Sequence, residues 1–429
     1  MSAEPSLTHR GGPLTAADID AAAERIAGVV APTPLQLSDR LSLATGAAVY
    51  LKREDLQSVR SYKLRGAYNL LMQLSADELA AGVVCSSAGN HAQGFAHACR
   101  SMGIHGRVYV PHNTPKQKRD RIRVHGGESV ELIAVGSTYD LAAAAALEDV
   151  ARTGATLVPP FDDLRTIAGQ GTIAAEILDQ LDDEPDLVVV PVGGGGCIAG
   201  ITTYLAERTT TTSVLGVEPA GAAAMIAALA AGEPVTLEHV DQFVDGAAVN
   251  RAGSLTYAAL AAAGDMVSVT TVDEGAVCTA MLDLYQNEGI IAEPAGALSV
   301  TALMETDQVE PGCTVVCLIS GGNNDVSRYG EILERSLVHL GLKHYFLVDF
   351  PQEPGALRGF LDQVLGPNDD ITLFEYVKRN NRETGAALVG IELGSAEDLE
   401  GLLARMAASD VDVERLTPDS PAYRYLINP

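Results

Sequence analysis

The sequence predicts an α/β protein whose main part contains open, parallel sheets and whose C-terminal part is a small α+β domain. From residue 14 to about residue 335, short apolar runs rich in β-branched residues alternate with helical stretches. Such runs are typical of parallel strands that helices cover on both faces. Near residue 340 the order changes to β-α-β-β-α-β, which describes a split, ferredoxin-like unit. A chain of 429 residues can form two or three hydrophobic cores.

The main part begins with an amphipathic helix over residues 14–30, which Pro32 and Pro34 end. The strands that we expect after this helix lie at residues 49–52, 82–85, 107–110, 130–135, 156–158, 187–192, 214–217 and 314–319.

The sequence pattern of residues 341–429 predicts that this C-terminal part forms a separate domain. It begins with a strand over residues 344–350, followed by a helix that ends near Leu365. The segments ITLFEYV and GAALVGIEL predict two further strands. A second helix follows with Ser395 as its N-cap residue, and the last strand is expected around residues 423–427.

Composition excludes several classes of partner. The formal charge is −27, from 29 basic and 56 acidic residues, which opposes binding to nucleic acid or to anionic lipid. The chain has neither an apolar leader segment nor an uninterrupted apolar stretch that could cross a membrane. Six scattered cysteines show no paired spacing. We therefore expect a soluble, cytoplasmic protein.

Four consecutive glycines, Gly193–Gly196, follow the strand DLVVVPV and precede a helix, ITTYLAER. Glycines let backbone N–H groups approach an oxyanion, and the helix N-terminus adds a favourable dipole. This segment therefore predicts a phosphate site. It also satisfies the dinucleotide pattern G-x-G-x-x-A, with Glu218 near the position of a ribose-binding acid. Two observations disfavour dinucleotide binding: the segment lies in the middle of the chain, and the motifs described below have no role in a dinucleotide-binding enzyme.

Lys63 begins a helix whose apolar face is formed by Leu64, Ala67, Leu70 and Leu71. A lysine that faces inward loses part of its charge, which is what a Schiff-base nucleophile requires. A solvated surface lysine is the alternative that local sequence alone leaves open.

The segment SSAGNHAQGFAHA, residues 86–98, follows another strand. Its small residues bring backbone N–H groups to a helix N-terminus, which suits a carboxylate, and Asn90 can hydrogen-bond a planar ring oxygen. His91 could be a base or could orient the loop. A capped helix without a ligand is the alternative.

Ser320 ends a third strand and precedes Gly321 and Gly322. In open α/β sheets, ligands lie beyond the carboxyl ends of the strands. The three strand-ending motifs are therefore expected to converge with Lys63 on one site.

In this order, the four motifs resemble the fold-type II pyridoxal-phosphate enzymes, which have a tryptophan synthase β-like fold, and most closely the threonine dehydratases (threonine deaminases) of biosynthesis. The resemblance extends from residue 14 to about residue 335. It implies a catalytic domain over residues 1–340 with two open α/β subdomains, of which the smaller is inserted at about residues 60–160. The implied reaction converts L-threonine to 2-oxobutanoate and ammonia, the first step of isoleucine biosynthesis.

The resemblance also implies roles for individual residues. Lys63 would carry pyridoxal 5'-phosphate and take the substrate Cα proton. Asn90 would contact the ring hydroxyl, and Ser320 the pyridine nitrogen. The phosphate would lie among Gly193, Gly194, Gly195, Gly196 and Cys197. The substrate would contact Ser87, Ala88, Gly89, Asn90 and His91.

Two departures from relatives narrow the prediction. Ala88 stands where serine racemases carry their second proton-transferring serine, which favours elimination over racemisation. Ala224 stands where metal-binding relatives have an aspartate paired with an acid like Glu218, so we expect no metal site.

The C-terminal domain resembles the ACT-like regulatory unit of the same enzymes, through FPQEPGALRGF at residues 350–360. The resemblance implies one such unit, inhibition by isoleucine, counteraction by valine, and a homotetramer. A domain that serves only assembly is the alternative.

Three near relatives compete within the same fold: threonine synthase, cysteine synthase and the tryptophan synthase β chain. The string SYKLRGAY, residues 61–68, and the C-terminal domain favour the dehydratase over all three. Outside enzymes, an amino-acid sensor with a decayed catalytic half is the alternative. L-Serine is an alternative substrate, because one methyl group contributes only about 1–3 kcal/mol to discrimination.

Overall fold

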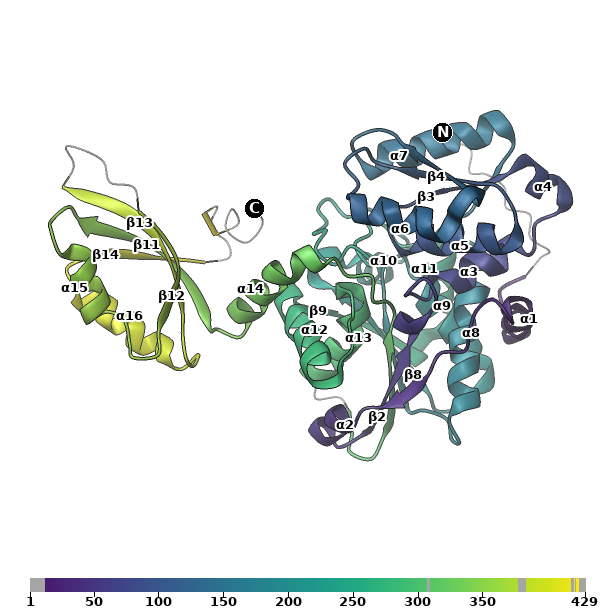
Figure 1. Ribbon diagram of the computed structural model, residues 1–429. Coiled ribbons are helices and arrows are strands. Elements are labelled where there is room, and N and C mark those ends of the chain that lie inside the picture. Colours follow the sequence, from purple (N-terminus) through teal and green to yellow (C-terminus); the bar gives the residue numbers. More distant parts are fainter. Residues whose placement is uncertain (1–11, 307–308, 377–382, 418–419, 421, 424–429) are drawn as a thin grey trace. The chain divides into compact units, whose positions relative to one another are not determined.

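The computed structural model describes residues 12–306, 309–376, 383–417, 420 and 422–423. The backbone forms two compact units (Figure 1). One contains the residues up to Glu274 together with Leu284–Asp325, and the other contains Gly275–Asp283 and the residues from Val326 on.

The first unit contains a large, mostly parallel sheet. Its strand order is β1-β2-β10-β7-β8-β9, and only β1 runs antiparallel to its neighbour. The strand bounds are Leu35–Leu37 (β1), Ala48–Arg53 (β2), Leu187–Pro191 (β7), Ser213–Pro219 (β8), Val267–Val272 (β9) and Thr314–Ile319 (β10). The parallel pairing of the predicted strands is confirmed, and β1 and β9 are additions to the prediction.

A second, smaller parallel sheet has the order β5-β4-β3-β6. Its strands are Val83–Ser86 (β3), Gly106–Val110 (β4), Val130–Ala134 (β5) and Thr156–Leu157 (β6). The helices in this stretch of the chain are Lys63–Leu71 (α3), Ala76–Ala81 (α4), Asn90–Met102 (α5), Lys116–Gly126 (α6) and Tyr139–Thr153 (α7). The two open α/β sheets expected for the fold-type II class are therefore present.

Helix α8 (Leu164–Gln180) occupies a central place beside the large sheet. It packs against α9 (Gly196–Arg208), α3 and α1 (Ala16–Ile26). Its contact with α9 is tight, since a Cβ atom on Gly200 would lie 2.4 Å from the carbonyl oxygen of Ile167. Helix α1 is shorter than the predicted span of residues 14–30, because Thr15 caps it and the chain leaves the helix after Ile26.

Further helices are Asp39–Thr45 (α2), Ala224–Ala231 (α10), Ser254–Ala263 (α11), Glu274–Glu288 (α12), Pro294–Glu305 (α13) and Tyr329–His339 (α14). Of these, α13 packs against β10 and β7.

The second unit contains an antiparallel sheet of order β12-β13-β11-β14. Its elements follow the predicted β-α-β-β-α-β order, namely Lys343–Pro351 (β11), Ala356–Gln363 (α15), Asp370–Tyr376 (β12), Thr384–Glu392 (β13), Asp398–Ala408 (α16) and Asp412–Leu416 (β14). Phe346, Val348 and Phe350 alternate along β11 and meet Phe360 of α15 and Leu402 of α16. Both helices therefore cover one face of the sheet (Figure 1).

Three predicted boundaries were wrong. The strand that follows α16 is β14, at residues 412–416, whereas Tyr423 is helical and residues 424–427 lie outside the described residues. Ser395 does not cap α16, because its Oγ accepts from the backbone N–H of Glu397 within a preceding turn and Glu397 is the N-cap residue. Helix α9 begins at Gly196, earlier than the segment ITTYLAER, because the last glycine already has helical backbone.

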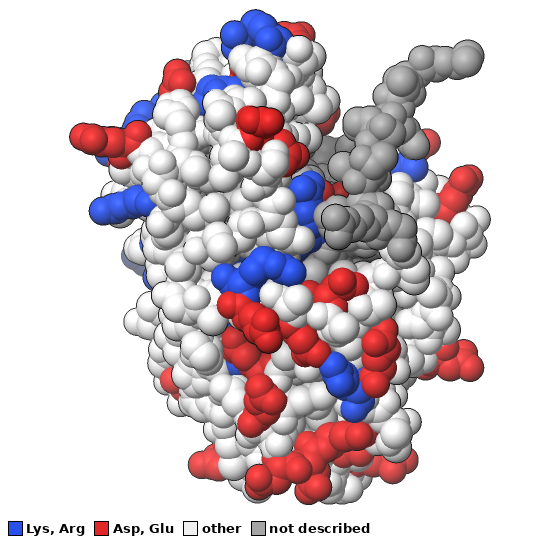
Figure 2. Space-filling view, turned by 90° about the vertical axis from the view of Figure 1, so that its right-hand side faces the viewer, with Lys and Arg blue, Asp and Glu red and all other residues white. Residues whose placement is uncertain are grey.

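The surface reflects the acidic composition. On the face shown in Figure 2, acidic side chains spread over the lower half, and most of the basic side chains lie above them. Within the described part of the chain, no helix combines the length and the apolar character that crossing a bilayer requires.

Candidate active site

Lys63 is the first residue of α3, and its side chain is partly buried. Its Nζ donates to the carbonyl oxygen of Pro160 (3.2 Å) and lies 5.1 Å from the ring centroid of Tyr62. No carboxylate among the described residues forms an ion pair with this amine. Burial lowers the pKa of Lys63 to about 8, although Cys197 and Glu293 act in the opposite direction. The amine therefore loses its proton far more readily than a solvated lysine.

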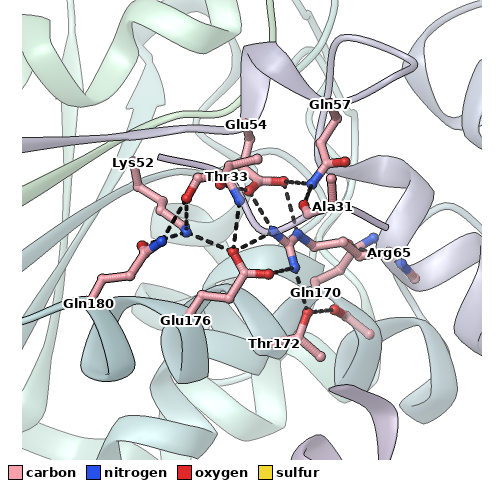
Figure 3. A network of polar contacts seen from close by, with 12 residues as sticks. Ala31, Thr33, Lys52, Glu54, Gln57, Arg65, Gln170, Thr172, Glu176 and Gln180 are labelled. Atoms are coloured by element: carbon pink, nitrogen blue, oxygen red, sulfur yellow. Dashed lines mark hydrogen bonds and ion pairs between the residues drawn. The ribbon is translucent and has the colours of Figure 1, made fainter. Parts of the chain in front are cut away.

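Arg65, two residues further along α3, joins the helix to a buried network of charges (Figure 3). Its guanidinium contacts both carboxylate oxygens of Glu54, at 2.7 and 2.9 Å, and both of Glu176, at 2.6 and 3.0 Å. The side chains of Arg65 and Glu54 are fully buried. Burial opposes the charge of Arg65, but the contacts with Glu54 and Glu176 outweigh it and raise the pKa.

Lys52 completes the network from β2. Its Nζ donates to Glu176 (2.7 Å), to the carbonyl oxygen of Thr33 (2.8 Å) and to Gln180 (2.9 Å) (Figure 3). Two buried cations thus balance two carboxylates, of which Glu54 is fully buried and Glu176 is 20% exposed. Since Glu176 and Gln180 belong to α8 and Glu54 follows β2, the network fixes the first turn of α3 against both elements.

The glycine loop joins β7 to α9. Gly195 is the N-cap residue of α9 and has φ +90°, and no side chain caps the first N–H groups of that helix. A Cβ atom on Gly194 would lie 2.3 Å from the ring of Phe161, and one on Gly195 would lie 2.5 Å from Met225 Cε. The positions therefore accept only glycine without rearrangement, and the uncapped helix end favours an anion.

Cys197, in the first turn of α9, is buried and close enough to Lys63 for each charge to affect the pKa of the other group. Burial raises the pKa of the Cys197 thiol to about 12, so the thiol is neutral at physiological pH. The glycine loop and the lysine are thus neighbours.

The small-residue loop lies between β3 and α5. Gly89 is the N-cap residue of α5, and Ser87 Oγ accepts from the backbone N–H of Gly89 (3.2 Å). Helix α5 packs against the start of α3 through Gly94, where a Cβ atom would lie 2.9 Å from Leu64 N and 3.0 Å from Lys63 C. This close approach brings the loop to the lysine.

His91 follows Asn90 in α5 and is buried. Its Nε2 contacts the carbonyl oxygen of Val158 (2.8 Å), so Nε2 carries the proton and Nδ1 is an acceptor. Nδ1 and the nearby Ser86 Oγ are buried without a hydrogen-bond partner in the described part of the chain. Burial and the charge of Lys63 lower the pKa of His91 to about 4, which favours an orienting role over that of a base.

Ser320 directly follows β10 and is buried. Its Oγ donates to the carbonyl oxygen of Ala295 (3.3 Å), and its own carbonyl oxygen accepts from the backbone N–H of Tyr62 (3.2 Å). The end of β10 thus lies against the residue before Lys63. The motifs predicted to converge are brought together around this lysine.

Comparison with known proteins identifies the family. Residues 26–321 match the family described as pyridoxal-phosphate dependent enzymes, and residues 334–426 match the C-terminal regulatory domain of threonine dehydratase. The chain is 84% identical over 430 residues to the biosynthetic L-threonine dehydratase of Mycobacterium tuberculosis, with 100% of both chains covered. The chain belongs to the biosynthetic threonine dehydratases, a family of pyridoxal-phosphate enzymes.

Two further relatives support the same family assignment. The biosynthetic L-threonine dehydratase of Corynebacterium glutamicum is 61% identical over 426 residues, which cover 98% of both chains. The solved structure of threonine deaminase isoform 2 from Solanum lycopersicum is 34% identical with a TM-score of 0.71, and covers 79% of this chain and 99% of its own. The resemblance drawn from the motifs, and with it the pyridoxal-phosphate cofactor, is confirmed.

The residues present fit this cofactor of the family. Lys63 offers an amine with a lowered pKa and without an ion pair among the described residues, as an aldehyde partner requires. The glycine loop offers the uncapped N-terminus of α9 to a phosphate. As to metals, the described residues include no group of three His, Cys, Asp or Glu arranged to hold an ion. Glu218 accepts instead from the backbone N–H groups of Met225 (2.8 Å) and Ile226 (2.9 Å).

Sequence reasoning missed three contributors to the site. Phe161 packs on the glycine loop, and Glu293 and Asn323 both hydrogen-bond Asn90. The one signal in the sequence is that Glu293 precedes Pro294 at a helix start. This pattern predicts where a helix begins, but it does not predict that Glu293 contacts Asn90, about 200 positions earlier in the chain.

We expect Arg65→Met to lower the free energy of unfolding by about 3–5 kcal/mol, because it leaves Glu54 and Glu176 buried near one remaining cation. Urea denaturation followed by circular dichroism measures the change. Arg208→Met is the control, because Arg208 pairs with Asp20 at the surface, where both side chains are more than 40% exposed. That variant is expected to lose less than about 1 kcal/mol. Equal losses in the two variants would contradict the buried network.

We expect Gly195→Ala to weaken binding of pyridoxal phosphate by about tenfold or more, which corresponds to about 1.4 kcal/mol. The methyl group would contact Met225 and Thr256 and shift the N–H groups of the loop. Titration of the apoprotein, followed by visible absorbance, measures the affinity. Gly232→Ala carries similar backbone strain, at φ +77°, in open space, and should bind the cofactor normally. Equal affinities in both variants would show that the loop is not the phosphate site.

Proposed function

We propose that this chain dehydrates and deaminates L-threonine to 2-oxobutanoate and ammonia, as the first step of isoleucine biosynthesis. The observation that carries the proposal is the 84% identity to a biosynthetic L-threonine dehydratase over the whole of both chains. Water leaves the substrate in the first half of the reaction and is taken up again when ammonia is released.

The positions of the site residues support the roles that we propose for them. Lys63 would join the cofactor, since its amine has a lowered pKa and lies beside the glycine loop. The N–H groups of Gly193, Gly194, Gly195, Gly196 and Cys197 would bind the phosphate. Asn90 would contact the ring hydroxyl, and Ser320, which follows β10, would contact the ring nitrogen.

When bound, pyridoxal phosphate supplies an aldehyde that captures the substrate amine and a ring that withdraws electrons from Cα. Lys63 then takes the Cα proton at Nζ, which its lowered pKa permits near neutral pH. Ser320 contributes a hydroxyl in place of a carboxylate, which leaves the ring nitrogen largely neutral and favours prompt loss of the β-hydroxyl group.

The loop Ser87, Ala88, Gly89, Asn90 and His91 holds the substrate carboxylate. Its backbone lies at the N-terminus of α5, where Gly89 provides no side-chain cap. His91 stays neutral and orients the loop through Val158. L-Serine, which lacks one methyl group, is expected to react more slowly, because such a group contributes about 1–3 kcal/mol.

Residues 1–340 are assigned to catalysis and residues 341–429 to regulation. The match of residues 334–426 to a threonine dehydratase regulatory domain supports this division. Isoleucine is the proposed inhibitor and valine the counteracting effector, with a coupling free energy of about 1–3 kcal/mol between effector and substrate sites. The active form is proposed to be a homotetramer.

The proposed location is the cytoplasm. All six cysteines are thiols outside any disulfide bond, and five of them are buried. Free thiols are typical of a reducing compartment.

We expect Lys63→Ala to abolish formation of 2-oxobutanoate from L-threonine while the protein stays folded. The variant lacks both the amine that holds the cofactor and the base that takes the Cα proton. A coupled keto-acid assay measures turnover, and circular dichroism checks folding. Borohydride reduction should fix the cofactor covalently to the wild type and not to the variant. Normal turnover of the variant would rule this lysine out, and a wild type that is inactive on threonine would refute the assignment of substrate.

We expect isoleucine to lower threonine turnover of the full-length protein, and valine to reverse this effect. Initial rates across threonine concentrations, with and without each effector, measure the coupling. Leucine serves as the control for a hydrophobic amino acid of the same size. Rates that do not respond to isoleucine would support a domain that serves assembly only.

A further inference from the structure

Glu293 is a buried carboxylate next to Lys63 that the roles above do not use. It is the N-cap residue of α13 and is 4% exposed. A short polar side chain at this position, such as that of Ser, Thr, Asp or Asn, accepts from the first N–H groups of the helix. Glu293 makes no such bond. Its carboxylate therefore has another partner.

That partner is Asn90. Asn90 Nδ2 donates to Glu293 Oε1 at 2.5 Å, although the two residues come from α5 and α13. The space for this contact depends on Gly321, the residue after Ser320, where a Cβ atom would lie only 2.2 Å from Glu293 Oε1. The carboxylate is thus packed tightly between Asn90 and the end of β10.

The other side of the Asn90 amide is also held. Its Oδ1 accepts from Asn323 Nδ2 (2.8 Å), and the same Nδ2 donates to the carbonyl oxygen of Val59 (2.8 Å). Asn323 Oδ1 in turn accepts from Arg121. The donors therefore run in one direction, from Arg121 through Asn323 and Asn90 to Glu293.

This chain of hydrogen bonds determines the orientation of the Asn90 amide. An ionised carboxylate only accepts, so the NH₂ group of Asn90 must face Glu293. One N–H of that group is engaged with Glu293, and the second remains for a ligand. A protonated Glu293 is a weaker acceptor and can also donate, so the amide would then be held firmly only on its Oδ1 side, by Asn323.

We propose that Glu293 is a positioning residue that acts through Asn90: its carboxylate holds the amide so that an N–H donor faces the ring oxygen of the cofactor. The inference rests on the proposed role of Asn90. It assigns to Glu293 no contact with the substrate and no transfer of a proton to it.

The ionisation of Glu293 makes this orientation dependent on pH. Burial raises the pKa of Glu293 to about 7, and Asp245 adds to this shift, while the hydrogen bond from Asn90 and the charges of Lys118 and Arg60 act against it. The remaining titratable groups whose pKa responds to Glu293 are Lys63, Arg121 and Tyr62. The amide is therefore held on both sides above neutral pH, and firmly on the Asn323 side alone below it.

The test follows the visible absorption band of the holoenzyme across pH without substrate. In the wild type we expect a change in the band with a midpoint near pH 7. In Glu293→Gln, which keeps the size and cannot ionise, this change should be lost. Because no substrate is added, a failure of the proposed threonine activity would leave the spectral result unaffected and would appear only in the keto-acid assay.

Two comparisons make the test specific. Glu218→Gln is the matched control, because burial also raises the pKa of Glu218 to about 7 at a helix start that does not contact Asn90. Its spectrum should titrate as the wild type does. In the Asn90→Ala background, Glu293→Gln should cause no further spectral change, since a residue that acts through another has no effect once that residue is removed.

Three results would overturn the inference: an unchanged titration in Glu293→Gln, loss of the titration in Glu218→Gln, or an equal effect of Glu293→Gln with and without Asn90. If Glu293→Gln fails to fold, Asn323→Ala removes the support on the other side of the same amide. It should reduce the spectral change with pH toward that of Asn90→Ala, and a wild-type titration in Asn323→Ala would contradict the proposal.

Discussion

Arg65 contacts two carboxylates, Glu54 from the turn that follows β2 and Glu176 from α8, and the position of Lys63 depends on this contact. Lys63 and Arg65 lie on nearly opposite sides of the first turn of α3. The guanidinium is fully buried and makes four hydrogen bonds to these carboxylates and a fifth to Thr172, so the turn cannot rotate without separating buried charges. The amine of Lys63 is thereby held at the site by α3, whose orientation is fixed by the contacts of Arg65 on the opposite side of the helix.

Burial has opposite consequences for the cations of this region. Arg65 is buried with two carboxylates, which outweigh the lost solvation and raise its pKa. At Lys52 burial outweighs the contact with Glu176, and the pKa is lowered. Lys63 is placed among neutral partners, a carbonyl oxygen and a tyrosine ring, so its charge is disfavoured and its pKa falls. The pairing of Arg65 and Lys52 gives a rigid support, and the absence of pairing at Lys63 within the described residues gives a reactive amine. This difference in partners explains why Lys63 is reactive while Arg65 and Lys52, close to it in the fold, serve as structural support.

The loops around Lys63 are held by close packing as well as by charge. Glycines at positions 94, 194, 195 and 321 stand where a methyl group would meet a neighbouring residue within 3 Å. At Gly321 that neighbour is the carboxylate of Glu293, which in turn contacts Asn90. The backbone of the loops around Lys63 and the orientation of the Glu293 and Asn90 side chains are thus coupled, and neither can change without the other.

The sequence by itself determined the fold class, most of the strands and the motifs of the site, because these depend on local apolar periodicity and on residues close together along the chain. It could not give β9, a half-exposed strand of mixed polarity, or β14, whose pairing depends on β11. Nor could it give the contact of Asn90 with Glu293 and Asn323, which more than 200 residues separate from it. Such contacts arise only when the carboxyl ends of distant strands meet, so tertiary structure alone decided which buried carboxylate lies beside the lysine.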